Sequence, residues 1–348
     1  MNDPTLQEGS NILPGSGCAR KFALRELRLN HLAQLSSPNP RIFIGVQDFD
    51  DVGAYELADG FLLVQSVDVI ASLPVKPYDF GAVSAAHCLS DLYAKGVAPQ
   101  TALSILFHSF TPYYPDRING IFSGLLDKLN EADVALIGGH TINEQSLFCG
   151  LAVSGVVAKE RIIRKSGARP GDVLLITKPI GTGIVSLATR HNMLGEFPQQ
   201  IIRCMATLNS SILKFIDKDY VHASTDVSGA GLAGSLFELA IQNSVEIVVN
   251  AKDVPCYEQA LAYATSMEED GALFNRTYVE GRVQFETGAS KSYENLFYDP
   301  QTSGGLLLAV APTALNQVID KLNSGGAMVE RLVIGEILRK GSPKVLVV

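Results

Sequence analysis

The sequence predicts an α+β fold in two domains, an N-terminal mixed-sheet domain and a C-terminal α/β domain. The chain has 348 residues, which is longer than the chains that usually fold around a single hydrophobic core. Strand-like and helix-like patterns occur in both halves. A charged, turn-rich stretch at 159–172 separates the halves and ends in Pro170-Gly171. We therefore expect an N-terminal domain over 41–158 and a C-terminal domain over 159–348.

The segment before the first strand-like run has a different character. It combines turn formers with one helical stretch at 24–35, and a Gly-rich segment, 15–18, lies within it. Nothing in it resembles a core strand. We expect residues 1–40 to form a mobile arm.

The strands of the N-terminal domain are apolar at nearly every position, and its helices are few. The predicted strands are 41–46, 61–70, 133–137 and 151–158, and the predicted helices are 80–95, which Gly96 ends, and 115–131. Continuous apolar strands imply burial on both faces of a sheet, whereas two helices cover one face. The other face is therefore expected to pack against a second copy, giving a homodimer.

The C-terminal domain alternates strands and helices. The predicted strands are 172–177, 245–249, 306–310 and 344–348, and the predicted helices are 199–217, 231–243 and 312–323. This alternation favours an α/β arrangement.

Composition and charge narrow the function classes. The formal net charge of -8 argues against a nucleic-acid partner, because neutralising phosphates requires a basic face. No apolar run reaches the roughly 20 residues that span a bilayer, so no membrane partner is expected. The five cysteines are odd in number and lack CxxC spacing. A reducing compartment, the cytoplasm, is therefore expected.

Several aspartates stand where a metal ion could be bound. Carboxylate oxygens are the ligands that magnesium prefers, and it shares its other positions with substrate phosphates. Asp68 is the most informative, because it interrupts an apolar strand and a buried carboxylate needs a partner. The alternative is that these residues serve turns and helix caps. The candidates are Asp48, Asp50, Asp51, Asp68, Asp91 and Asp226.

Two glycine segments could approach an anion. Gly138-Gly139-His140-Thr141 ends a predicted strand, where backbone N–H groups can bind a phosphate, although a tight turn explains it equally well. Residues 229–234 read Gly-Ala-Gly-Leu-Ala-Gly between a strand and a helix, which is typical of a dinucleotide oxidoreductase. Asp226 and the lack of an acidic residue after the next strand argue against that interpretation.

Cys18 is a candidate reactive thiol. It lies in the Gly-rich segment with Arg20 and Lys21 nearby, and neighbouring cations stabilise a thiolate. The alternative is an incidental surface thiol. His87 and Asp91 lie four residues apart on one predicted helix, which suggests a structural pair more than a catalytic dyad.

Taken together, these motifs resemble those of the selenophosphate synthetase (selenide, water dikinase) family, in the aminoimidazole-ribonucleotide-synthetase-like superfamily. The likeness runs over nearly the whole chain, and the segment 299–307 is its most specific part. The matching segments are Gly15-Ser16-Gly17-Cys18 with Lys21, Asp50-Asp51, Ser66-Val67-Asp68, 89–94, 138–141, 150–153, 177–183, 224–227 and 299–307.

The resemblance implies an ATP-dependent enzyme that converts selenide and water to selenophosphate, AMP and phosphate, with Mg2+ as cofactor. It implies that Cys18 handles selenium and that Lys21 attends the transferred phosphate. A homodimer and a selenium-delivery protein are the partners it suggests. It assigns Mg2+ to Asp51, Asp91 and Asp226. It assigns ATP to Lys21, Asp48, Phe49, Asp50, Asp68 and Asp91, and, across a dimer interface, to Gly139, His140 and Thr141.

The chain also departs from the family pattern. His87 replaces a usual Asn, Lys95 a usual Met and Ala230 a usual Phe, and Arg20 stands where some members carry a second cysteine. Residues 143–147 replace an acidic, proline-containing stretch. No proposed metal ligand is lost. Another small-molecule kinase of the superfamily and a catalytically weak nucleotide-binding paralogue remain the alternatives.

Overall fold

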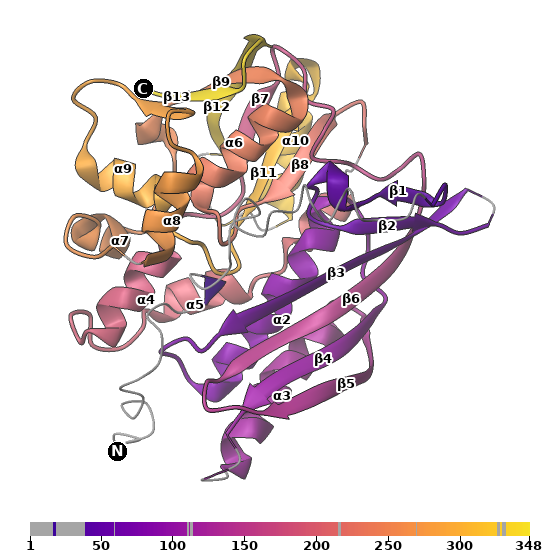
Figure 1. The fold of residues 1–348 in the computed structure, drawn as a ribbon, viewed down its shortest axis with the longest axis vertical. Helices are drawn as coiled ribbons and strands as arrows, with labels where there is room; N and C mark the ends of the chain where they lie inside the picture. The colour runs from indigo at the N-terminus through magenta and orange to yellow at the C-terminus, as the bar shows by residue number, and fades with distance from the viewer. Residues whose placement is uncertain are drawn as a thin grey trace.

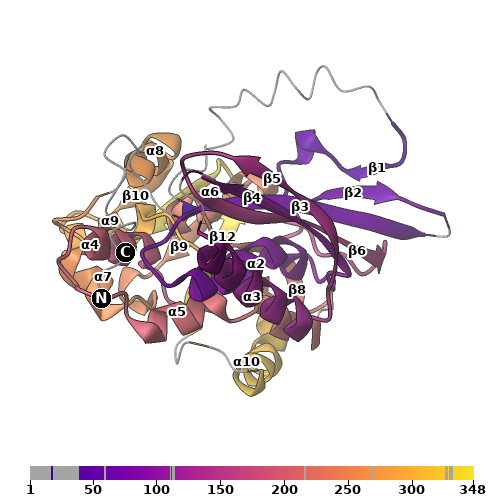
Figure 2. The ribbon, with the colours of Figure 1, turned by 90° about the horizontal axis from the view of Figure 1, so that it is seen from below.

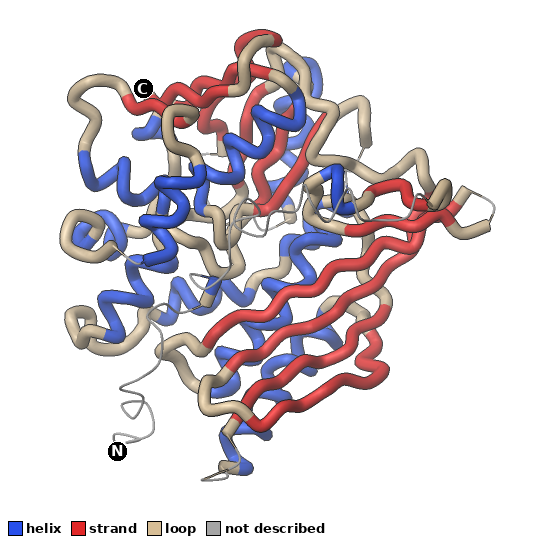
Figure 3. Tube along the Cα trace, viewed as in Figure 1, coloured by secondary structure: helices blue, strands red, loops and turns tan. Residues whose placement is uncertain are grey.

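The computed structural model describes Gly17, Cys18 and residues 39–348, apart from 59, 110, 112–113, 215–216, 269, 326–327 and 329–331. Most of the expected arm, Lys21 included, therefore lies outside the described residues. The described chain forms two separate sheets, each flanked by helices (Figures 1 and 3).

The N-terminal sheet has six strands in the order β1-β2-β3-β6-β4-β5. Neighbouring strands are antiparallel, except β4 and β5, which run parallel. The strands are β1 (Ile42–Ile44), β2 (Gly53–Glu56), β3 (Phe61–Ala71), β4 (Thr101–His108), β5 (Ala135–Asn143) and β6 (Phe148–Ala158). The sheet is mixed, as predicted, and its two edges are β1 and β5.

Two helices, α2 (Pro77–Ala94) and α3 (Pro115–Glu131), lie against one face of this sheet (Figure 2). The other face carries exposed apolar side chains, among them Val67 and Val69 of β3 and Leu103 of β4. Burial consequently alternates along β3. Among the described residues, helices cover one face of this sheet alone, and the expectation of a second copy concerns the other face.

The C-terminal sheet has seven strands in the order β10-β13-β9-β12-β7-β11-β8. The pairs β10–β13 and β13–β9 are parallel and the others antiparallel. The strands are β7 (Val173–Ile176), β8 (Val221–Asp226), β9 (Val245–Val249), β10 (Val283–Phe285), β11 (Leu306–Val310), β12 (Val333–Lys340) and β13 (Lys344–Val347).

Helices connect and cover these strands. The α-helices are α4 (Thr182–Arg190), α5 (Gln199–Ala206), α6 (Gly231–Asn243), α7 (Glu258–Tyr263), α8 (Asp270–Tyr278), α9 (Lys291–Tyr298) and α10 (Leu315–Ser324). The 3-10 helices of the described chain are η3 (Val46–Asp48), η4 (Asn209–Lys214), η5 (Ala251–Asp253) and η6 (Pro312–Ala314). Both domains thus combine a mixed sheet with helices, which confirms the predicted α+β class.

Two predicted elements need correction. The predicted helix 199–217 is interrupted, because Thr207 is extended (φ −72°, ψ 127°) and ends α5. The strand expected over 133–137 does not end at the glycines but continues to Asn143 as β5. A register shift in the pairing with β4 at Ala102/Leu103 lies opposite Gly138, and glycine within a strand commonly marks such a bulge. Residues 139–141 therefore lie within a strand and not in a turn.

The dinucleotide interpretation of residues 229–234 does not fit the topology. A dinucleotide fold places consecutive parallel strands side by side, whereas β8 is an edge strand and three strands separate it from β9. Gly231 has a different purpose. Its φ is +68°, and a Cβ there would lie 2.9 Å from the Phe297 carbonyl oxygen. This glycine allows α6 to begin close against the C-terminal end of α9.

Helix α2 is the element that the two domains share. Every residue from Phe80 to Ala94 is buried, and the helix packs against β3 and β6 on one side and against α5, η4 and β8 on the other. A helix that is apolar nearly all round is expected to be enclosed in this way. Gly96, with φ +71°, follows its end, as predicted. Among the described residues, no helix has the length and hydropathy needed to cross a membrane.

Candidate functional site

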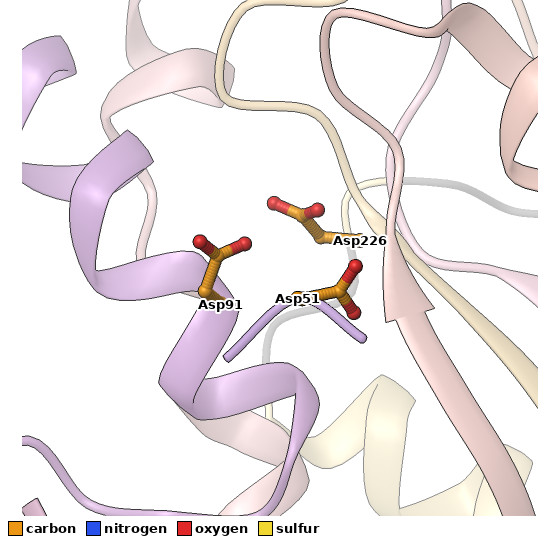
Figure 4. Close-up of side chains that lie close together, drawn as sticks. All are labelled: Asp51, Asp91 and Asp226. Atoms are coloured by element: carbon orange, nitrogen blue, oxygen red, sulfur yellow. The ribbon is translucent and has the colours of Figure 1, made fainter. Parts of the chain in front are cut away.

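Three aspartates from distant parts of the sequence meet between the domains. Asp51 follows η3, Asp91 lies on α2, and Asp226 ends β8 (Figure 4). One ligand atom from each lies within 4.8 Å of the others. Figure 4 shows the three carboxylates converging on one space. The sequence named these three residues as metal ligands, and the structure brings them together.

Asp51 is the most heavily paired member of this cluster. Its Oδ1 lies 2.8 Å from Lys165 Nζ and accepts a hydrogen bond from Thr225 Oγ1 at 3.0 Å. Its Oδ2 lies 2.7 Å from Lys95 Nζ. Burial alone would raise the pKa of Asp51, but the two ammonium groups outweigh it and hold the pKa below its usual range. Asp51 is therefore an anion at any physiological pH.

Asp91 and Asp226 are the two most deeply buried carboxylates of the cluster. Asp91 Oδ2 accepts a hydrogen bond of 2.5 Å from Ser66 Oγ, which points inward from β3. Asp226 is the last residue of β8 and pairs with Leu306 of β11. The end of a strand leaves a side chain free to turn away from the sheet and toward the domain boundary.

Cys18 is seated against the same region. Gly17 forms an antiparallel bridge with Ala71 at the end of β3, through two hydrogen bonds of 3.2 Å. The Cys18 N–H donates to Thr302 Oγ1 at 3.2 Å. A Cβ on Gly17 would lie 2.0 Å from that Thr302 oxygen, so this position favours glycine. Cys18 is buried, which rules out the alternative of a surface thiol.

His87 is the partner of Cys18 that sequence reasoning missed. Its Nε2 lies 3.2 Å from Cys18 Sγ and 3.4 Å from Asp68 Oδ2. The Ser303 N–H donates to Nδ1 at 3.3 Å. An amide can only donate, so Nδ1 is an acceptor and the neutral ring carries its proton on Nε2. That N–H is directed toward the sulfur, and a donor at this distance stabilises a thiolate.

The thiol and the carboxylate cluster are linked through two facing elements. His87 and Asp91 are one turn apart on α2, about 6 Å along the axis. Their partners Asp68 and Ser66 are two residues apart on β3 and so point to the same face. The matched spacing places the Cys18 sulfur, through His87, next to the metal ligand Asp91 along α2.

The segment 299–305 supports this seat. Gln301 Oε1 accepts hydrogen bonds from the N–H groups of Gly181 at 2.8 Å and Thr182 at 3.2 Å. Asp299 Oδ2 accepts from the Gly183 N–H at 3.0 Å. The two motifs that sequence analysis singled out separately therefore form one structural unit, which presents Thr302 and Ser303 to Cys18 and His87.

The other predicted nucleotide residues are in two places. Asp48 accepts hydrogen bonds from Arg164 Nη2 and the Gly45 N–H, both at 2.7 Å, and Phe49, with φ 48°, turns the chain toward Asp50. Asp50 Oδ1 lies 2.6 Å from Lys95 Nζ. Residues 139–141, by contrast, are exposed on the edge strand β5, at the opposite edge of the sheet from β1.

The donor set of the cluster fits magnesium. All three groups are carboxylates, which are hard oxygen ligands, and Asp91 and Asp226 are buried. Lys95 and Lys165 offset Asp50 and Asp51. Asp91 and Asp226 lie close enough to complete a site for a divalent cation.

Comparison with known families defines the class of protein first. Residues 49–157 match the model of the AIR synthase related protein N-terminal domain, and residues 169–348 match that of the C-terminal domain. A solved protein from Thermus thermophilus superposes with a TM-score of 0.69 at 22% identity, covering 94% of this chain and 97% of that one. A thiamine-monophosphate kinase from Stenotrophomonas maltophilia superposes with a TM-score of 0.63 at 20% identity, covering 94% and 96%. These likenesses establish the two-domain fold.

Full-length relatives then define the family. A selenide, water dikinase of Pelobacter propionicus is 35% identical over 350 aligned residues, which cover 100% of both chains. One from Trichlorobacter lovleyi is 36% identical and covers 97% of this chain and 98% of its own. The chain belongs to the family of selenide, water dikinases.

Lys178 gives the site a testable electrostatic property. Its Nζ is buried and donates to the carbonyl oxygens of Thr207 at 2.7 Å and Ser303 at 3.2 Å. Burial lowers the pKa of Lys178 to about 8. A neutral amine retains two N–H donors, so both hydrogen bonds survive loss of the charge.

Stability should therefore depend on Lys178 at alkaline pH. Between about pH 8 and the ordinary lysine value of 10.5, the unfolded chain binds more protons than the folded one. The free energy of unfolding should consequently rise with pH, by an amount on the order of 3 kcal/mol. Urea unfolding of wild type and Lys178→Met across this range should show the rise in wild type alone. Lys291→Met, at an exposed lysine, is the control, and parallel pH profiles for wild type and Lys178→Met would contradict the assignment.

Proposed function

We propose that this chain makes selenophosphate from selenide, ATP and water and releases AMP and phosphate. Its place in the family of selenide, water dikinases carries the activity, and full-length coverage disfavours another small-molecule kinase or a weak paralogue. The supporting observation in the structure is that His87, which contacts the Cys18 sulfur, and Asp91 are one turn apart on α2. A selenium-handling thiol and a nucleotide–metal cluster need to be this close to act on one phosphoryl group.

The carboxylate cluster serves the nucleotide in this proposal. Phosphoryl transfer is mostly positioning and neutralisation of phosphate charge. Asp51, Asp91 and Asp226 would hold Mg2+, which supplies that neutralisation when bound. Lys21 would attend the transferred phosphate, and the ATP contacts would come from Asp48, Phe49, Asp50, Asp68 and Asp91. Enclosure between two domains excludes water that would intercept the phosphoryl group.

Cys18 would handle selenium, and His87 would stabilise its anionic sulfur. The Nε2–H of His87 is directed at the sulfur, and the Ser303 N–H holds the ring in place at Nδ1, on its other side. The Thr302 hydroxyl holds the Cys18 backbone in place. A selenium-delivery protein as a partner, a cytoplasmic location and a domain boundary at 158/159 belong to the same proposal.

The proposed site is completed by a second copy of the chain. Gly139, His140 and Thr141 lie on β5, at the edge of the sheet opposite the η3 end that carries Asp50 and Asp51. The uncovered sheet face between these edges carries exposed apolar side chains, as interfaces of homodimers do. A twin packed on this face could bring its residues 139–141 to the nucleotide.

Replacing Cys18 by Ser should leave the fold intact and abolish selenide-dependent AMP formation. A hydroxyl retains the size of the thiol but is a far poorer nucleophile at neutral pH. The measurement follows AMP and the phosphorus NMR signal of selenophosphate on incubation with ATP, Mg2+ and selenide. Cys256→Ser, at a half-buried cysteine, controls for the loss of a thiol. Unchanged activity in Cys18→Ser would remove Cys18 from the mechanism.

Asp51→Asn, Asp91→Asn and Asp226→Asn should each weaken Mg2+-dependent binding of a non-hydrolysable ATP analogue by at least about tenfold. A carboxamide keeps the shape but loses the charge that offsets the cation. Double variants should lose little more than single ones, because ligands of one ion act as a unit. Calorimetric titration with and without Mg2+ measures the effect, and Asp219→Asn, at an exposed aspartate, is the control. Full affinity in all three variants would refute the metal site.

Leu63→Glu should dissociate the dimer and reduce activity with it. Leu63 occupies the uncovered face of β3 with Val67 and Val69, and a charge there resists burial against a twin. Sedimentation at low micromolar concentration and selenide-dependent AMP formation are the two measurements. Leu273→Glu, at an exposed leucine of α8, is the matched control. A wild-type protein that sediments as an active monomer would refute the shared site.

A further inference from the structure

Lys95 has surroundings that resemble those of a bound cation. Its side chain is fully buried, at 0% exposure. Its Nζ lies 2.6 Å from Asp50 Oδ1 and 2.7 Å from Asp51 Oδ2, and it donates to the Ser224 carbonyl oxygen at 2.7 Å. An ammonium has three N–H donors and no acceptor, and here three oxygens surround it at hydrogen-bond distance.

The three oxygens come from both domains. Asp50 and Asp51 follow η3 in the N-terminal domain, whereas Ser224 belongs to β8, two residues before Asp226. Lys95 itself follows the last residue of α2, one turn beyond Asp91. The ammonium therefore lies beside the proposed metal ligands, on the side of the cluster that Asp51 faces.

The charge balance explains why a lysine is tolerated there. Burial works against the charged form of Lys95, and the carboxylates of Asp50 and Asp51, at 2.6 Å and 2.7 Å from its Nζ, compensate for that cost. Lys95 is paired with Asp50 and Asp51, and Lys165 is paired with Asp51 and Glu238, so three carboxylates share these two ammonium groups. A neutral residue at 95 would leave one more negative charge for dissolved cations to offset.

We propose that the Lys95 ammonium occupies a cation position of the carboxylate cluster, so that the cluster binds divalent ions fewer in number or more weakly than it would with a neutral residue at 95. The inference rests on the proposed metal role of Asp51, Asp91 and Asp226. A tethered cation does not dissociate, so the Asp50–Asp51 side of the cluster is neutralised and ordered at any magnesium concentration.

The test is a titration with Mn2+ or Mg2+ alone, without nucleotide. Mn2+ binding is followed by the electron paramagnetic resonance of the free ion, and Mg2+ by the shift in the thermal unfolding midpoint. Lys95→Met removes charge and donors together. Lys95→Gln retains donors for the oxygens and keeps the variant foldable if Lys95→Met is not. Lys95→Arg retains the charge, and Lys128→Gln is the control at a more exposed lysine.

Lys95→Gln should bind an additional divalent ion per subunit, or bind the same number at least roughly tenfold more tightly, because a positive charge near a divalent ion is removed. Its unfolding midpoint should rise more with Mg2+ than that of wild type, whereas Lys95→Arg and Lys128→Gln should behave like wild type. Equal number, affinity and midpoint shift in wild type and Lys95→Gln would overturn the inference and leave the metal site standing. Binding that Asp226→Asn does not change, in wild type and in Lys95→Gln alike, would overturn the metal role and the inference with it.

Discussion

The arrangement of this protein depends on neutralising carboxylates that are buried between two domains. Asp50 and Asp51 come from the N-terminal domain, and Lys165 reaches them from the segment that begins the C-terminal half. Lys165 also pairs with Glu238 of α6 at 2.7 Å. Buried charges are costly unless each is paired, so the two domains cannot separate without exposing or stranding these groups. The ion pairs of the site thus fix the position of one domain relative to the other.

Helix α2 brings this electrostatic constraint and the packing of the core together. It is buried from Phe80 to Ala94. His87 and Asp91 lie on it and Lys95 follows its last residue, each four residues from the next. That spacing puts all three on one face. The face therefore carries, one after the other, the partner of the thiol, a metal ligand and an ammonium group. Polar groups on a buried face require partners, and here β3 and the loop after η3 supply them.

The thiol end of this face depends on segments that are distant in sequence. Cys18 is placed by a bridge to Ala71 and by Thr302, while Ser303 fixes the tautomer of the histidine beside it. Segment 299–305 is itself held by hydrogen bonds to residues 181–183. Substitutions in segment 299–305 or in residues 181–183 would therefore affect the Cys18 sulfur through these contacts and not through a contact with a substrate.

The sequence by itself determined the α+β class, most helices and strands of regular pattern, and the three aspartates that meet, because these follow from local periodicity and from the family motifs. Val245–Val249 and Leu306–Val310 have the predicted bounds, whereas short strands such as β2 and β10 lack enough residues to show a period. Only the tertiary structure decided the rest. The sequence suggested a structural pair of His87 and Asp91, whereas the fold placed His87 beside Cys18. The fold also set Lys95 between Asp50 and Asp51. Such contacts join residues far apart in the chain, and the free energy of pairing a buried charge is defined only once folding has removed the water around it.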